Sequence, residues 1–203
     1  MQILQIVFSV LILFSDQSNP YNKFLFNGVS LDGWQVIDFE GHGDIYVTDS
    51  CLIIGRGEEI SGVKWIKDFP VTNYEVSLDA KRIEGSDFFC GLTVPVKKSF
   101  ITLVIGGWGG AVVGLSCIDG FDAANNDTYS LVNFEKGIWY LIRLRITDEK
   151  IEAWIDNDKI VDFVIGNYEL SLRWEVESSV PFGITTYKTT GALRNIRLNM
   201  VSD

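Results

Sequence analysis

Histidine and cysteine are scarce in this sequence of 203 residues. The only histidine, His42, has Asp44 nearby, but these two side chains do not make a metal site without ligands from elsewhere in the chain. The three cysteines lack the spacing of a zinc knuckle and cannot all pair within one chain. We therefore predict no zinc site, name no metal ligand, and expect no Ser-His-Asp catalysis, for which no motif is present.

Basic residues are in the minority. The chain has 17 Lys and Arg against 27 Asp and Glu, which gives a formal net charge of −10. Because nucleic-acid binding needs a basic face that neutralises phosphates, this balance argues against a nucleic-acid partner. Apolar residues make up 47% of the chain, which is enough for a hydrophobic core and excludes intrinsic disorder.

No apolar run has the length of a membrane span. The longest, residues 4–14, has the length of a signal-peptide apolar region and ends at the polar residues 15–20. It predicts that residues 1–20 are a signal peptide or disordered N-terminus, that the protein is secreted or in the cell envelope or periplasm, and that the mature chain has no membrane span. The alternative is a buried first strand or helix, and the lack of Lys or Arg before Lys23 favours it.

In an exported chain Cys90 and Cys117 are the candidate disulfide; otherwise they are small buried apolar side chains.

Short runs of β-branched and aromatic residues, separated by Gly, Asp and Asn clusters, fill residues 23–203. Helical periodicity is almost absent, so this pattern predicts an antiparallel all-β domain. The clearest hairpin joins residues 151–155 to residues 160–164. In the strand before it, residues 140–147, every second residue is apolar, which predicts one buried and one solvated face.

Two further runs, residues 100–105 and 111–118, are nearly all apolar or small. Strands of this kind are buried on both faces or form the floor of a groove. Together with the many hairpins, they predict one domain folded as a jelly-roll β-sandwich of two curved antiparallel sheets. The sequence predicts no particular oligomeric state.

Four motifs are distinctive: FLFNGVSLDGW at residues 24–34, GIWY at 137–140, IEAWID at 151–156 and GALRNIRL at 191–198. Together they resemble the 3-keto-disaccharide hydrolase domain family over most of residues 23–201. The resemblance implies a concanavalin A-like sandwich whose concave face meets a carbohydrate, in a bacterial envelope or secreted setting. Some members of that family act on 3-keto-glycosides, by elimination to a keto-glycal or by net hydrolysis.

Elimination from a 3-keto sugar needs one general base and one positive group. The ketone acidifies the C2 proton, the base removes it, and a cation or a divalent metal steadies the enolate. Asp87 and Asp119 lie near the glycine-rich central loops, so we take them as candidate bases, with Arg143 or Lys64 as the positive group. The alternative for both aspartates is a turn residue that binds its own backbone.

A retaining glucanase would instead need two carboxylates close together on one strand. The nearest match is Glu175-Val176-Glu177, which we expect on a strand, with a solvated strand edge as the alternative to an acid and nucleophile pair.

Sugar rings stack on flat aromatic side chains, and Trp108 is the best candidate for this role. Its four glycine neighbours at residues 106–110 leave the ring prominent, although it could equally plug one end of the sandwich. Trp65, Lys64 and Asp122 complete the predicted substrate-binding set.

The rival hypothesis is a noncatalytic carbohydrate- or protein-binding module of the envelope, favoured by the missing carboxylate pair and the single histidine.

Overall fold

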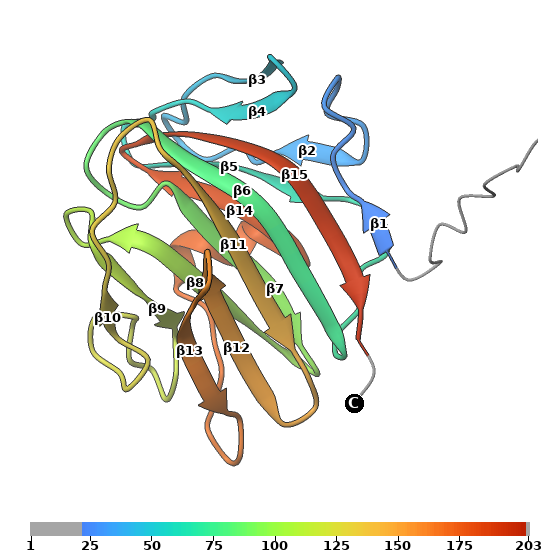
Figure 1. Ribbon diagram of the computed structural model, residues 1–203, viewed down its shortest axis with the longest axis vertical. Helices are drawn as coiled ribbons and strands as arrows, with labels where there is room; N and C mark the ends of the chain where they lie inside the picture. The colour runs from blue at the N-terminus through green and yellow to red at the C-terminus, as the bar shows by residue number, and fades with distance from the viewer. Residues whose placement is uncertain (1–21, 202–203) are drawn as a thin grey trace, which may run out of the picture.

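The computed structural model describes residues 22–201, which form two antiparallel β-sheets packed face to face (Figure 1). In spatial order the first sheet holds β13 (Asp158–Val164), β12 (Lys150–Ile155), β11 (Trp139–Ile146), β6 (Tyr74–Glu84), β15 (Thr190–Met200), β4 (Cys51–Ile54) and β3 (Ile45–Thr48), with β1 (Asn22–Phe24) paired to β15. The second holds β10 (Ser130–Leu131), β9 (Val112–Ser116), β8 (Ser99–Gly107), β7 (Cys90–Val96), β14 (Phe182–Tyr187), β5 (Ile60–Trp65) and β2 (Trp34–Val36). One 3₁₀ helix, η1 (Trp174–Ser179), precedes β14. The predicted all-β jelly-roll sandwich is confirmed.

The hydrophobic core fills the space between the sheets. Alternating apolar and polar residues along a strand place the apolar side chains in this core. On β11, Ile142, Leu144 and Ile146 are fully buried in the core. Arg143 and Arg145, which alternate with them, extend from the opposite face and ion-pair with Glu75. The prediction of one buried and one solvated face is confirmed for this strand.

The predicted hairpin is β12 and β13, with Ile151 opposite Phe163 and Ile155 opposite Asp158. A register shift between Ala153 and Trp154 interrupts the ladder, which a simple period-two pattern does not indicate.

The outer face of the second sheet carries small and polar side chains. On β8, Leu103 faces the core, so its neighbours Thr102 and Val104 point outward, and Ser116 does the same on β9. Thr102 bonds through its hydroxyl to Thr93 on β7, at 2.9 Å. A floor of short side chains leaves room above it, and this is where the pocket described below lies.

The cysteines do not form the disulfide considered for Cys90 and Cys117, since all three are free and buried. The register explains this. Cys90 on β7 lies opposite Ile105 on β8, and Ile105 lies opposite Val113 on β9. Cys117 lies four residues beyond Val113, which is about 13 Å along the chain. Its Cα is therefore too far from the Cα of Cys90 for a disulfide. Burial raises the pKa of the Cys90 thiol, as expected for an inert core side chain.

The apolar segment at residues 4–14, for which an export signal is predicted, lies outside the described residues. Within residues 22–201, no helix has the length and apolar character needed to cross a membrane.

Tyr74 ties the two sheets together. Its ring is fully buried, and its hydroxyl on β6 donates a 2.6 Å hydrogen bond to the Pro95 carbonyl on β7. Burial raises the pKa of Tyr74, so the hydroxyl stays protonated and remains a donor.

We expect Tyr74→Phe to lower the free energy of unfolding by about 1–3 kcal/mol, because the buried carbonyl loses its partner. Urea denaturation measures this; the exposed Tyr46→Phe is the control, and equal stability of the two variants would contradict the role.

Candidate functional site

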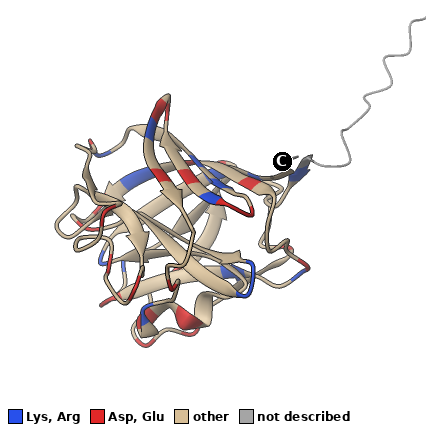
Figure 2. Ribbon diagram, turned by 90° about the horizontal axis from the view of Figure 1, so that it is seen from below, with Lys and Arg blue, Asp and Glu red and all other residues tan. Residues whose placement is uncertain are grey.

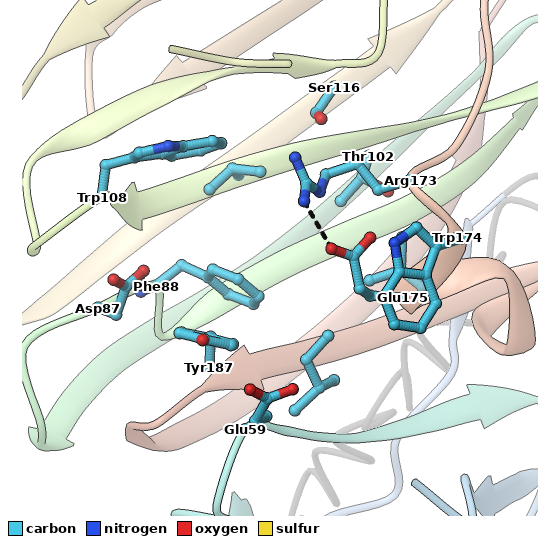
Figure 3. Close-up of a pocket in the computed structure, with 13 residues that line it drawn as sticks. Glu59, Asp87, Phe88, Thr102, Trp108, Ser116, Arg173, Trp174, Glu175 and Tyr187 are labelled. Carbon is cyan, nitrogen blue, oxygen red and sulfur yellow. Dashed lines mark hydrogen bonds and ion pairs between the residues drawn. The ribbon is translucent and has the colours of Figure 1, made fainter. Parts of the chain in front are cut away.

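A pocket of about 420 Å³ opens on the outer face of the second sheet (Figure 3). Its floor is the outward-facing part of β8 and β9, and its walls come from η1, from the loop between β6 and β7, from the loop after β8 and from the end of β14. The lining residues are Glu59, Ile60, Asp87, Phe88, Thr102, Val104, Trp108, Ser116, Arg173, Trp174, Glu175, Val176 and Tyr187. Segments more than one hundred residues apart in sequence therefore build one site.

Aromatic rings form much of the wall. Trp108 lies on one side of the pocket and Trp174 on the other, with exposed fractions of 45% and 77%. Phe88 and Tyr187 stack on each other between them, with ring centroids 5.9 Å apart and an angle of 26° between the planes. Flat, partly exposed rings around a cavity are suited to the apolar C–H face of a sugar.

The charged centre of the pocket is the pair formed by Arg173 and Glu175 at the start of η1. Arg173 Nη2 donates to Glu175 Oε1 at 2.5 Å, and its Nη1 lies 3.5 Å from Asp122 Oδ2. The second carboxylate oxygen, Glu175 Oε2, is buried and has no hydrogen-bond partner. Buried carboxylate oxygens normally have partners, so this one is an unsatisfied acceptor beside the pocket.

Two opposing effects act on the pKa of Glu175. Burial raises it, but the hydrogen bond from Arg173, a hydrogen bond from the backbone of Glu175 itself and the charge of Arg173 together outweigh burial, so the pKa lies below its ordinary value. The same hydrogen bond raises the pKa of Arg173. The pair is therefore a carboxylate beside a guanidinium, with one carboxylate oxygen unsatisfied.

Asp87, a base candidate from the sequence, lines the same pocket, but both of its oxygens are engaged. Oδ1 accepts the N–H of Phe88 at 2.8 Å, and Oδ2 accepts the N–H of Gly109 at 3.1 Å. This is the turn-residue geometry weighed as the alternative for Asp87.

The structure brings Asp87 and Trp108 together, and Asp122 reaches the pocket wall through Arg173. The other predicted residues lie elsewhere. Asp119 accepts the N–H of Glu169 at 2.7 Å in a turn outside the pocket lining. Arg143 extends from the outer face of the first sheet, where it lies 4.5 Å from the Trp154 ring.

Trp65 and Lys64 also lie away from the pocket. Trp65 is 3% exposed and packs edge-on against Trp34 at 5.3 Å in the core, so its ring is not free to stack on a ligand. Lys64 pairs with Gly183, against which Ser179 of η1 packs, and it is not among the lining residues.

The expectation that residues 175–177 form a strand is wrong. They belong to η1, which buries Val176 and Ser179 against the sheet while Glu175 turns toward Arg173. In a 3₁₀ helix residues three apart lie on the same side. Glu175 and Glu177 are two apart, so their side chains do not share one face as they would in a strand.

Several lining residues have no role in the sequence-based prediction, among them Glu59, Phe88, Arg173, Trp174 and Tyr187. For Arg173 a signal was present, because Arg-Trp-Glu at residues 173–175 combines a cation, an aromatic ring and a carboxylate. Phe88 lies in the loop before β7 and Tyr187 is the last residue of β14, and no local pattern separates them from core residues.

A metal has no ready set of ligands in the described part of the chain. Across residues 22–201, no three His, Cys, Asp or Glu side chains come together closely enough to hold one. His42 is exposed, and its Nδ1 lies 2.9 Å from the Gly43 carbonyl oxygen. We therefore derive no step through the divalent metal considered above.

The 3-keto-alpha-glucoside-1,2-lyase-like domain family matches residues 22–199. The chain belongs to this family. The match includes every lining residue of the pocket, and it confirms the resemblance drawn from the four motifs. No curated protein matches the chain at a significant level.

Solved structures of low sequence identity share the fold of this lyase-like domain. A Parabacteroides distasonis protein described as a "putative glycosyl hydrolase" has a TM-score of 0.56 and 16% identity, over 89% of this chain and 94% of its own. The carbohydrate-binding module CBM66 of Bacillus subtilis has a TM-score of 0.54 and 13% identity, over 87% and 99%. The Crh5 transglycosylase in complex with NAG has a TM-score of 0.59 and 10% identity, over 90% and 85%. The family and the fold are those of carbohydrate-active, glycosyl-hydrolase-like domains.

Proposed function

We propose that the protein is a carbohydrate-active lyase or hydrolase that takes the keto-sugar ring of a 3-keto-glycoside into the pocket. The observation that carries the proposal is the buried, unpartnered Oε2 of Glu175 beside Arg173, within a wall of partly exposed aromatic rings. Membership of the lyase-like domain family supports the substrate class.

In this reaction Glu175 is the general base. Its Oε2 takes the proton from C2, which the neighbouring C3 ketone has acidified, and negative charge develops on the ketone oxygen. Arg173 stabilises that charge, since a fixed guanidinium in a partly desolvated site needs no reorganisation. The electron pair then forms the C1=C2 double bond, the C1–O bond breaks, and the leaving oxygen takes a proton. The products are a keto-glycal and the free alcohol, and addition of water to the glycal gives net hydrolysis.

Glu175 is a better base than Asp87 because its free oxygen has no competing hydrogen bond. A proton on Asp87 would disrupt the bonds that its two oxygens accept from Phe88 and Gly109. Asp119, Arg143 and Lys64 have no part in this proposal, because they do not line the pocket.

Product analysis tests the proposal. The purified protein is incubated with matched pairs of ordinary and 3-keto disaccharides, with and without divalent metal and chelator, and products are read by mass spectrometry. We expect a keto-glycal or a free keto-sugar from the oxidised substrates alone. Turnover of the ordinary disaccharides, or of neither class, would contradict it.

Arg173 should control the pH dependence of turnover. A protonated Glu175 cannot act as a base, so activity falls as the pH drops through its pKa, which Arg173 holds below the ordinary value of 4.5. In Arg173→Met both effects of the guanidinium are lost, and burial, the largest effect, is opposed only by the backbone hydrogen bond of Glu175, so the acid limb of kcat/KM should move to higher pH. The pH profile of kcat/KM measures this, with Arg143→Met on the other sheet as the control. An unmoved acid limb would show that Glu175 is not the titrating base.

The second candidate function is a noncatalytic sugar-binding module. The full engagement of Asp87 by loop N–H groups favours it, because one of the three pocket carboxylates then has a purely structural role. The same substrate panel separates the two: a module binds the sugars, which calorimetry measures, and leaves them unchanged.

A further inference from the structure

The loop that carries Trp108 has an unfavourable backbone. Trp108 has φ +48°, a left-handed conformation that costs a non-glycine residue about 1 kcal/mol or more, and Gly106, Gly109 and Gly110 also have positive φ. Such a loop keeps one shape only where its surroundings hold it. The contacts made by two charged side chains, one from each side of the loop, explain how it is held.

Arg82 holds the two ends of the loop. It extends from β6 in the first sheet, is 5% exposed, and lies 5.0 Å from the Phe89 ring. Its Nη2 donates to the Gly110 carbonyl at 2.8 Å and to the Gly106 carbonyl at 3.3 Å. One guanidinium therefore bridges the residues at which the loop leaves and rejoins the sheet.

Asp87 holds the middle of the loop. Its Oδ2 accepts the N–H of Gly109, the residue directly after Trp108. The glycine at position 106 is required by this arrangement, because a Cβ there would lie 2.5 Å from Arg82 Nη2. Glycine, arginine and aspartate thus form one structural unit around the tryptophan.

We infer that Arg82 and Asp87 are positioning residues that hold the Trp108 ring as a preformed wall of the sugar pocket. Arg82 does not line the pocket, so it acts through Trp108. The ligand-binding part of this inference rests on the proposed function, whereas the position of the ring does not.

Fluorine NMR tests the position of the ring without any ligand. The protein is labelled with 5-fluorotryptophan, and the Trp108 signal is assigned by its loss in Trp108→Phe. We expect Arg82→Lys, which loses the two-carbonyl bridge, to shift or broaden that signal. Arg194→Lys is the matched control, because Arg194 lies 4.1 Å from the Trp139 ring on the first sheet and should alter only the Trp139 signal. A Trp108 signal unchanged in Arg82→Lys would overturn the inference.

A double-mutant cycle tests whether Arg82 affects sugar binding through Trp108. We expect Arg82→Lys to weaken sugar binding about fivefold, the value of one lost hydrogen bond, and to have no effect when Trp108 is already alanine. Losses that simply add would overturn the inference. If Arg82→Lys does not fold, Asp87→Ala takes its place in both experiments, since it removes the acceptor of the Gly109 N–H. If no sugar binds to the wild type, the proposed function fails while the NMR result still decides the inference.

Discussion

Glu175→Gln should lower kcat on a 3-keto-glycoside by at least ~100-fold, the lower end of what general base catalysis contributes. Glutamine keeps the size of the side chain and an oxygen that accepts the Arg173 hydrogen bond, but it cannot take a proton from C2. The free enzyme is therefore expected to fold normally and to bind substrate with little change in KM. Initial rates from product quantification give both constants.

Glu177→Gln is the matched control for this prediction. Glu177 lies in the same 3₁₀ helix, is exposed, and does not line the pocket. It should keep wild-type kcat. If both variants retained activity, the base would have to be sought elsewhere, with Asp87 and Glu59 as the other carboxylates that line the pocket.

Trp108→Ala should weaken binding of the sugar by ~10- to 100-fold. The indole has a large surface that is 45% exposed in the free protein, and stacking on a pyranose would cover part of it. Trp108→Phe keeps a smaller ring and should lose less. Isothermal calorimetry with the 3-keto disaccharide and the Glu175→Gln variant measures affinity without turnover.

Trp154→Ala serves as the control for this prediction. Trp154 lies on the outer face of the first sheet, stacked with Arg143 and Arg145, far from the pocket lining. Its loss should leave sugar affinity unchanged. Equal affinity of wild type and Trp108→Ala would remove Trp108 from the binding site and favour a purely structural role for the ring.

The fold could be predicted because its signals are local. In β11 and in the hairpin that follows it, alternating apolar residues mark the buried face, and a turn cluster marks the reversal of the chain. Residues 175–177 show the limit of such signals. Three residues that alternate polar and apolar fit a strand, but the spacing of the buried Val176 and Ser179 is that of a 3₁₀ helix.

The site was only partly predictable because strand pairing is not local. Asp87 and Trp108 flank neighbouring strands β7 and β8, so glycine-rich loops near each other in sequence indicated them. Arg173 and Glu175 reach the same pocket through η1, which packs on β14. Strand β14 pairs with β7, and the paired residues are some ninety positions apart in the sequence. Arg143 illustrates the reverse case, since its solvated face is evident from the sequence but the sheet to which it belongs is not.

Acidic residues outnumber basic ones in this protein, and both are spread over the molecule. Figure 2 shows short acidic and basic segments scattered over the ribbon. The 3₁₀ helix η1 has two acidic residues, Glu175 and Glu177, in its first turn. The overall negative charge of the chain does not by itself select a ligand, so the local Arg173–Glu175 geometry has to carry the chemistry.

The most direct test of the account is hydrogen exchange at C2. A 3-keto sugar without a leaving group at C1 is incubated with the protein in D₂O, and deuterium at C2 is followed by NMR. We predict exchange faster than in buffer for the wild type and for Glu177→Gln, and exchange at least ~100-fold slower for Glu175→Gln. Exchange at the buffer rate in the wild type, or at the wild-type rate in Glu175→Gln, would contradict proton removal by Glu175.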